Sequence, residues 1–127
     1  MPIPPRSKNF SVTIRRSGSA SLVDVTGSFT SFEAGALRQA ITGLIADKRN
    51  DIVLNLSGLD YLDSSGIGEL VRNYMTVIKS GGTMKVVGLS ARVEEILKIT
   101  QLYKVFPEFP DEEAALKNIP GNTEKSS

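Results

Sequence analysis

Two adjacent hydroxyl groups carry the clearest chemical signal in this sequence. Residues 58–68 read Gly-Leu-Asp-Tyr-Leu-Asp-Ser-Ser-Gly-Ile-Gly, which places Ser64 and Ser65 directly after Asp63. An apolar run, residues 52–56, precedes this segment, and an amphipathic helical pattern follows it. The hydroxyls therefore lie where a strand passes into a helix. The unpaired N–H groups and the positive dipole of a helix start can hold a phosphate group there.

The same segment also has a simpler interpretation. Aspartate and serine are common helix caps, so Asp63 or Ser64 could do no more than cap the helix, while Gly66 and Gly68 allow close packing. The segment lacks the Gly-Lys-Ser/Thr of a phosphate-binding loop and the Gly-x-Ser-x-Gly turn of hydrolases. From these residues alone, a helix cap and a phosphorylation site both remain open.

The composition argues against several classes of function. The 127 residues include no histidine and no cysteine, which removes the commonest general base, the Ser-His-Asp triad, thiolate metal sites and disulfides. A net charge of +1 argues against a large nucleic-acid-binding surface. The apolar runs are far shorter than the ~20 residues that span a bilayer. We therefore predict a cytoplasmic protein with no cofactor, no metal, no direct nucleic-acid contact and no membrane insertion.

Hydrophobic periodicity predicts alternating strands and helices. A hairpin opens the chain, and strand–helix pairs with helix caps at Thr30 and Ser90 follow it. Strands are expected at residues 10–14, 22–25, 51–56, 84–87 and 105–106, and helices after residues 30, 63, 90 and 111, the last over 112–118.

The helix that follows the Ser-Ser turn has two predicted faces. Its apolar residues are expected to face the core: Ile67, Leu70, Val71, Tyr74, Val77 and Ile78. The polar residues on its other side are expected to face solvent: Glu69, Arg72, Asn73, Thr76 and Lys79.

These elements predict a single α/β domain over residues 9–119. Strand–helix–strand units require parallel strands, so we expect a mixed sheet of four or five strands, an N-terminal hairpin plus parallel strands, packed with about four helices. Residues 1–8 and 120–127 are expected to be a flexible arm and a flexible tail. Functional sites in such sheets collect beyond the carboxyl ends of the strands, here at residues 27–31, 57–65 and 88–90.

The sequence resembles a known family. Residues 51–70 look like the core of the STAS domain family and, within it, of the bacterial anti-sigma factor antagonists. Residues 79–90 and 93–106 resemble the segments that follow in that family, and the likeness extends over about residues 10–118. The Asp-Ser-Ser-Gly-Ile-Gly turn after an apolar strand is its most specific part.

The resemblance implies a partner-switching function and no enzyme activity. The unmodified antagonist binds an anti-sigma factor, which is a serine kinase, and so frees a sigma factor. The kinase phosphorylates the serine directly after the Asp of this turn, binding is lost, and a serine phosphatase resets the system. The matching serine here is Ser64.

The expected partner-binding residues lie around this serine. They are Thr30, Ser31, Asp63, Ser64, Ser65, Gly66, Gly68, Leu89 and Ser90. The sequence departs from the family at one of them, because an Asp is often found near the phosphorylation site where this chain has Thr30. The departure concerns how a kinase docks more than it concerns the fold.

Two other functions remain to be considered. A STAS-like interaction module of a lipid-transport or other signalling assembly would use the same turn as a docking surface, without phosphorylation. A small enzyme or nucleotide-binding protein would use the loops at the sheet edge, but the absence of histidine and of a phosphate-loop lysine argues against it.

Overall fold

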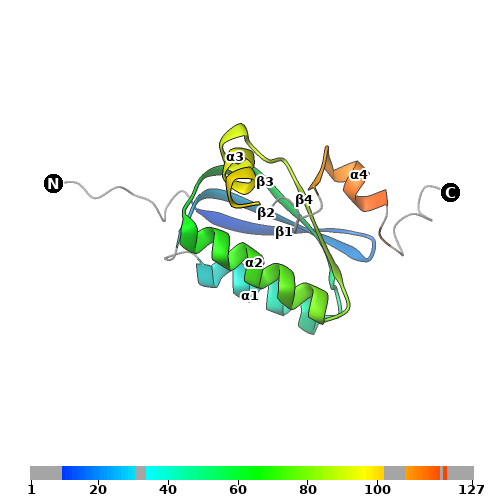
Figure 1. Ribbon diagram of the computed structural model, residues 1–127. Helices are drawn as coiled ribbons and strands as arrows, with labels where there is room; N and C mark the ends of the chain where they lie inside the picture. Colours follow the sequence, from blue (N-terminus) through cyan, green and yellow to red (C-terminus); the bar gives the residue numbers. More distant parts are fainter. Residues whose placement is uncertain (1–9, 31–33, 102–107, 118, 120–127) are drawn as a thin grey trace.

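Strands and helices alternate along the chain, as the periodicity predicts (Figure 1). The computed structural model describes residues 10–30, 34–101, 108–117 and 119. The strands are β1 (Ser11–Ser17), β2 (Ala20–Phe29), β3 (Asp51–Leu62), β4 (Thr83–Val87) and β5 (Glu108–Phe109). The helices are α1 (Ala34–Ala46), α2 (Ser64–Lys79), α3 (Ala91–Thr100) and α4 (Glu112–Lys117).

The sheet has the mixed topology that the sequence predicts. Its strand order is β1-β2-β3-β4-β5, with β1 antiparallel to β2 and the remaining neighbours parallel. Gly18, with φ of 59°, turns the chain between β1 and β2, a conformation that glycine adopts without cost. The helices α1, α2 and α3 each connect two parallel neighbours. The predicted α/β class and the hairpin-plus-parallel sheet are therefore confirmed.

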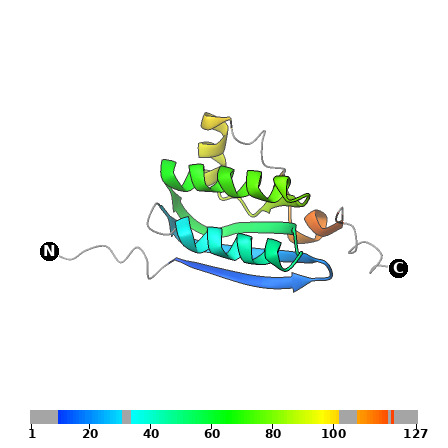
Figure 2. The ribbon, with the colours of Figure 1, turned by 90° about the horizontal axis from the view of Figure 1, so that it is seen from below.

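Two hydrophobic clusters lie on the two faces of the sheet. The larger cluster joins β2, β3 and β4 to α1, α2 and α3. The smaller one packs Ala20, Leu22, Val53 and Val87 of the strands against Ala115 and Ile119, in and just after α4. Neighbours such as Val53 and Leu54 fall in different clusters because alternate strand residues point to opposite faces. Figure 2 shows α1 and α2 running side by side along the sheet.

Strands β2 and β3 are longer than predicted. The sequence places the end of β3 at Leu56, yet β3 continues to Leu62 and pairs with a β2 that continues to Phe29. Two register shifts, between Asp24 and Thr26 and between Gly27 and Ser28, make this pairing possible. Polar residues are tolerated in this extension because the pairing of β3 with β4 ends at Asn55, which leaves the extension partly exposed. The predicted loop at 57–65 is therefore mostly strand.

Several predictions about the ends and edges have different outcomes. The last helix is confirmed, and Asp111 caps it by accepting a hydrogen bond of 2.8 Å from the Ala114 N–H. The strand predicted at 105–106, the capping box that begins at Thr30, and the arm and tail fall wholly or mostly outside the described residues. The edge strand that is described is Glu108–Phe109, paired with Val86 and Val87. Within the described ranges, no helix is long and apolar enough to cross a membrane.

Candidate functional site

The start of α2 is capped by Asp63 and not by a serine. The Asp63 backbone is extended, and its Oδ1 accepts a hydrogen bond of 2.8 Å from the Gly66 N–H. Its carbonyl oxygen accepts the first helical hydrogen bond, 2.9 Å from the Ile67 N–H. The capping role is thus filled, and the hydroxyls of Ser64 and Ser65 stand on the exposed first turn of the helix.

The two serines point in different directions around α2. At about 100° per residue, Ser64 lies about 180° around the helix axis from the buried Asn73. Ser65 lies about 100° further around the axis, on the side of the helix that also carries Arg72. Ser64 is therefore on the outward face of the helix, where a second protein has the freest access.

The end of β2 lies against the start of α2. Phe29 pairs with Leu62 across the sheet, so Thr30 and Asp63 follow directly from neighbouring strand ends. A Cβ atom added to Gly66 would lie 2.3 Å from the Phe29 carbonyl oxygen and 2.8 Å from Leu62 Cδ1. Only glycine fits at such a close approach. The fold therefore brings together Thr30, which is buried, and the Asp63–Gly66 turn, as predicted from the sheet edge.

Gly68 has a different environment from Gly66. A Cβ atom added to Gly68 would meet only Arg72 Nη2, at 3.7 Å, so packing does not require glycine at this position. Its missing side chain leaves open helix surface one turn after Ser64. Ser31, the remaining predicted residue of this group, lies outside the described residues.

The loop after β4 meets β3 upstream of the turn. Gly88, with φ of 77°, lies where an added Cβ would be 2.8 Å from both Asn55 Oδ1 and Ser57 Cβ. Leu89 packs against the larger cluster, and Ser90 Oγ accepts a hydrogen bond of 3.2 Å from the Val93 N–H. The predicted cap of α3 is confirmed. A partner contact at Leu89 and Ser90 stays a prediction.

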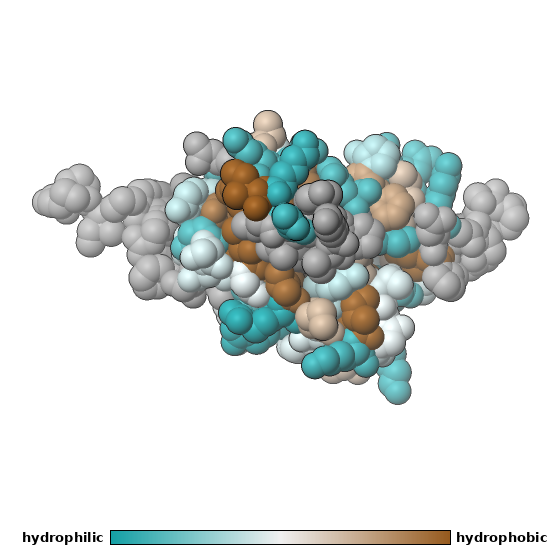
Figure 3. Space-filling model, viewed as in Figure 1, coloured by the Kyte–Doolittle hydropathy of each residue, from teal (hydrophilic) through white to brown (hydrophobic). Residues whose placement is uncertain are grey.

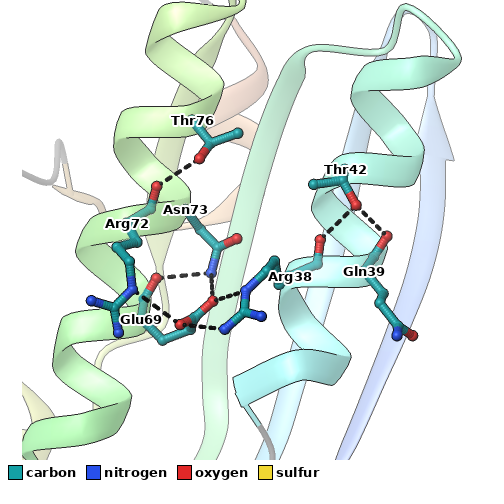
Figure 4. A network of polar contacts seen from close by, with 7 residues as sticks. All are labelled: Arg38, Gln39, Thr42, Glu69, Arg72, Asn73 and Thr76. Atoms are coloured by element: carbon teal, nitrogen blue, oxygen red, sulfur yellow. Dashed lines mark hydrogen bonds and ion pairs between the residues drawn. The ribbon is translucent and has the colours of Figure 1, made fainter.

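A buried carboxylate ties α2 to α1, and the sequence pattern did not reveal it (Figure 4). The Glu69 side chain is 1% exposed and accepts hydrogen bonds from Arg38 Nε at 2.9 Å and Arg38 Nη2 at 3.1 Å. Arg72 Nε approaches Glu69 Oε1 at 3.4 Å, and Asn73 Nδ2 donates to the Glu69 carbonyl oxygen at 2.8 Å. The prediction that Glu69 and Asn73 face solvent was wrong, because α1 covers this flank of α2.

The network keeps Glu69 charged. The hydrogen bonds from Arg38 hold the pKa of the Glu69 carboxyl below its ordinary value, although burial acts in the opposite direction. The pKa of Arg38 is raised by the same contact. A residue inside the protein thus fixes how α1 and α2 lie together, and hence where the first turn of α2 points.

An open cavity of about 510 Å³ lies at another part of the sheet edge, between Asn55, Gly88 and residues 110–113. The Glu112 carboxylate in this cavity forms an ion pair with Arg15 and accepts a hydrogen bond of 2.6 Å from Asn55 Nδ2. The contact with Arg15 holds the pKa of the Glu112 carboxyl below its ordinary value. The described residues contain no cluster of three or more acidic, His or Cys side chains suited to a metal.

Comparison with known proteins identifies the family of this fold. The family model of the STAS domain matches residues 11–115, and the chain belongs to the STAS domain family. An anti-sigma-B factor antagonist of Bacillus subtilis (strain 168) is 30% identical over 94 residues, which cover 74% of this chain and 85% of that protein.

Solved structures agree with this assignment. The crystal structure of an anti-sigma factor antagonist from Mycobacterium paratuberculosis has a TM-score of 0.78 and 29% identity, covering 91% of this chain and 97% of that one. The Bacillus cell fate determinant SpoIIAA in the phosphorylated form has a TM-score of 0.64 at 17% identity, over 82% of this chain and 96% of that one, which shows the shared fold. The predicted resemblance is confirmed.

The two glycines of the first helical turns predict opposite effects on stability. Gly66→Ala should destabilise the protein by about 1–3 kcal/mol, because the added Cβ would overlap the Phe29 carbonyl. Gly68→Ala should stabilise it by up to about 1 kcal/mol, because alanine favours a helix and nothing obstructs it. Urea unfolding measures both. Equal effects would contradict the close approach at Gly66.

The Glu69 network predicts an acid-sensitive stabilisation. Arg38→Ala should lower the free energy of unfolding at pH 7 more than Arg72→Ala does, because Arg38 makes the two shorter contacts. The folded pKa of Glu69 is depressed, so its contribution is complete above its ordinary pKa and is lost as the pH falls through the folded value. The difference between wild type and Arg38→Ala should therefore shrink in acid. A difference that stays constant down to pH ~2 would contradict this account.

Proposed function

We propose that this protein is an anti-sigma factor antagonist that binds an anti-sigma factor serine kinase and is inactivated by phosphorylation at Ser64. The observation that carries the proposal is the exposed Ser64 hydroxyl, on the outward face of a helix start that Asp63 already caps. Relatives that bear the name anti-sigma factor antagonist support it. In the unmodified state the protein would occupy the anti-sigma factor, and a sigma factor would be free.

The chemistry of the switch belongs to the kinase. The Ser64 Oγ would attack the γ-phosphorus of ATP, the bond to the β-phosphate would break, ADP would leave, and the hydroxyl proton would pass to a base of the kinase. A serine phosphatase would restore the hydroxyl by hydrolysis. This chain would thus be a substrate and a regulator in the cytoplasm, and not a catalyst.

The physical effect of the phosphate follows from the surroundings of Ser64. A phosphoserine carries about −1.5 to −2 charges at pH 7 and three acceptor oxygens. The first N–H groups of α2 are suited to hold it, since a helix start lacks intrahelical acceptors for them. The Asp63 carboxylate beside it has the same sign of charge. A partner that fits the neutral turn would therefore meet added bulk and negative charge at the centre of the contact.

The position of Thr30 bears on which kinase docks. Thr30 is buried at the end of β2, next to the strand end that leads into Asp63, and it replaces the acidic residue often found there in the family. A kinase suited to this chain would then need no cation opposite that position. The same turn would also be the docking surface in a lipid-transport or other signalling assembly that uses no phosphorylation. Mapping the phosphorylated residue separates the two functions.

Phosphorylation should occur at Ser64 and nowhere else. The protein is incubated with ATP and the kinase-like anti-sigma factors of the same genome, and the product is mapped by mass spectrometry. Ser64→Ala should abolish phosphate incorporation, whereas Ser65→Ala should retain it. Phosphate at another residue, or none with any of these kinases, would contradict the switch and favour the assembly without phosphorylation.

A fixed charge at Ser64 should weaken partner binding. Ser64→Asp is expected to raise the Kd for the anti-sigma factor by about tenfold or more, which corresponds to about 1.4 kcal/mol. Ser64→Ala should bind like the wild type, because it adds neither charge nor bulk. Isothermal titration calorimetry measures the Kd of the wild type and of both variants. Equal affinities would count against repulsion at the turn.

A further inference from the structure

An exposed apolar stripe runs along the outside of α2. The sequence pattern places Val71 and Ile78 on the core side, but Ile78 is 41% exposed, Met75 is 46% exposed, and Val71 is half-buried. We call these three residues the α2 stripe. In the orientation of Figure 1, the space-filling view shows hydrophobic surface over this helix, bordered by hydrophilic side chains (Figure 3). Large apolar side chains in a row on one helix face mark a binding surface more often than single ones do.

The α2 stripe lies on the same face of the helix as Ser64. At about 100° per residue, Val71, Met75 and Ile78 lie within about 40° of Ser64 around the helix axis. The row extends about 20 Å from Ser64 to Ile78. The open backbone at Gly68 lies between the hydroxyl and Val71. A partner that covers Ser64 can therefore continue along the same helix face without obstruction.

The exposed charged side chains of α1 and α2 are positive. Arg72, which is 70% exposed, and Lys79 are the exposed charged side chains of α2, and Arg38 of α1 adds a third cation, 57% exposed. Glu69 is the single carboxylate of the helix, and it is buried. A surface that matches this face must present apolar side chains with carboxylates beside them.

We propose that the α2 stripe is the docking surface for an apolar, carboxylate-bordered face of the anti-sigma factor; this inference rests on the proposed function. It gives a reason for the effect of phosphorylation that the turn alone does not supply. The partner's carboxylates are attracted by Arg72 and Lys79, and a phosphoserine at the head of the same face repels them. The same partner carboxylates are thus attracted by the cations of α2 and repelled by a phosphate on Ser64.

The test compares apolar residues of similar exposure on α2 and away from it. The double variant Met75→Ser/Ile78→Ser should bind the anti-sigma factor at least about tenfold more weakly, as expected when central apolar contacts are removed. Ile14→Ser is the matched control, because Ile14 on β1 is also 41% exposed but lies outside α2. Its affinity should remain within about twofold of wild type. Circular dichroism melting checks that each variant is folded.

Charge supplies the second measurement. Affinity of the wild type should fall as NaCl rises from about 0.05 to about 0.5 M, because attraction between exposed charges is screened. Lys79→Glu should weaken binding at low salt, whereas Lys48→Glu, at an exposed residue just after α1, should not.

The outcomes separate this inference from the proposed function. If Ser64→Asp weakens binding but the double variant binds like wild type, the α2 stripe is not the docking surface and the proposed function stands. Salt-independent affinity would also overturn the inference. If sedimentation shows a wild-type dimer that the double variant abolishes, a second copy covers the stripe and the inference is again wrong. Unchanged affinity in both the Ser64→Asp and the double variants would overturn both proposals.

Discussion

The approach of the Gly66 backbone to the Phe29 carbonyl is the constraint on which the site depends. No side chain fits between them, so the first turn of α2 packs directly on the end of β2. This contact requires β2 and β3 to remain paired as far as Phe29 and Leu62, which the two register shifts allow. Asp63 then leaves the sheet as the cap of α2, and Ser64 follows on the outward face.

A second contact fixes the direction of the same helix. Glu69 is buried between α1 and α2 and takes its hydrogen bonds from Arg38, whose guanidinium reaches solvent. Such an ion pair is weak evidence for overall stability, since removing two charges from water is costly. Its value here is orientation, because the two hydrogen bonds from Arg38 form only when α1 and α2 lie in this arrangement. The buried side of α2 is thereby set, and with it the exposed side.

These two contacts determine which side of α2 stays exposed. The fold supplies a hydroxyl at a helix start, an apolar row below it and cations beside the row. A phosphoryl group would change the charge at one end of this surface without entering the core, because Ser64 is exposed.

Local signals in the sequence determined much of this protein. The cap at Ser90, the hairpin, the alternation of strands and helices, and the resemblance carried by Asp-Ser-Ser-Gly-Ile-Gly depend on residues close together in the chain, and the structure agrees with them. The sequence left the cap of α2 between Asp63 and Ser64, and the structure assigns it to Asp63. The tertiary structure alone decided that β3 runs on to Leu62, that Glu69 and Asn73 are buried, and that Ile78 is exposed. Each of these depends on which distant element lies alongside: β2 beside the end of β3, and α1 beside one flank of α2 but not the other. Hydrophobic periodicity within one segment predicts which of its faces are apolar and which are polar. It cannot predict which face an element from elsewhere in the chain will cover.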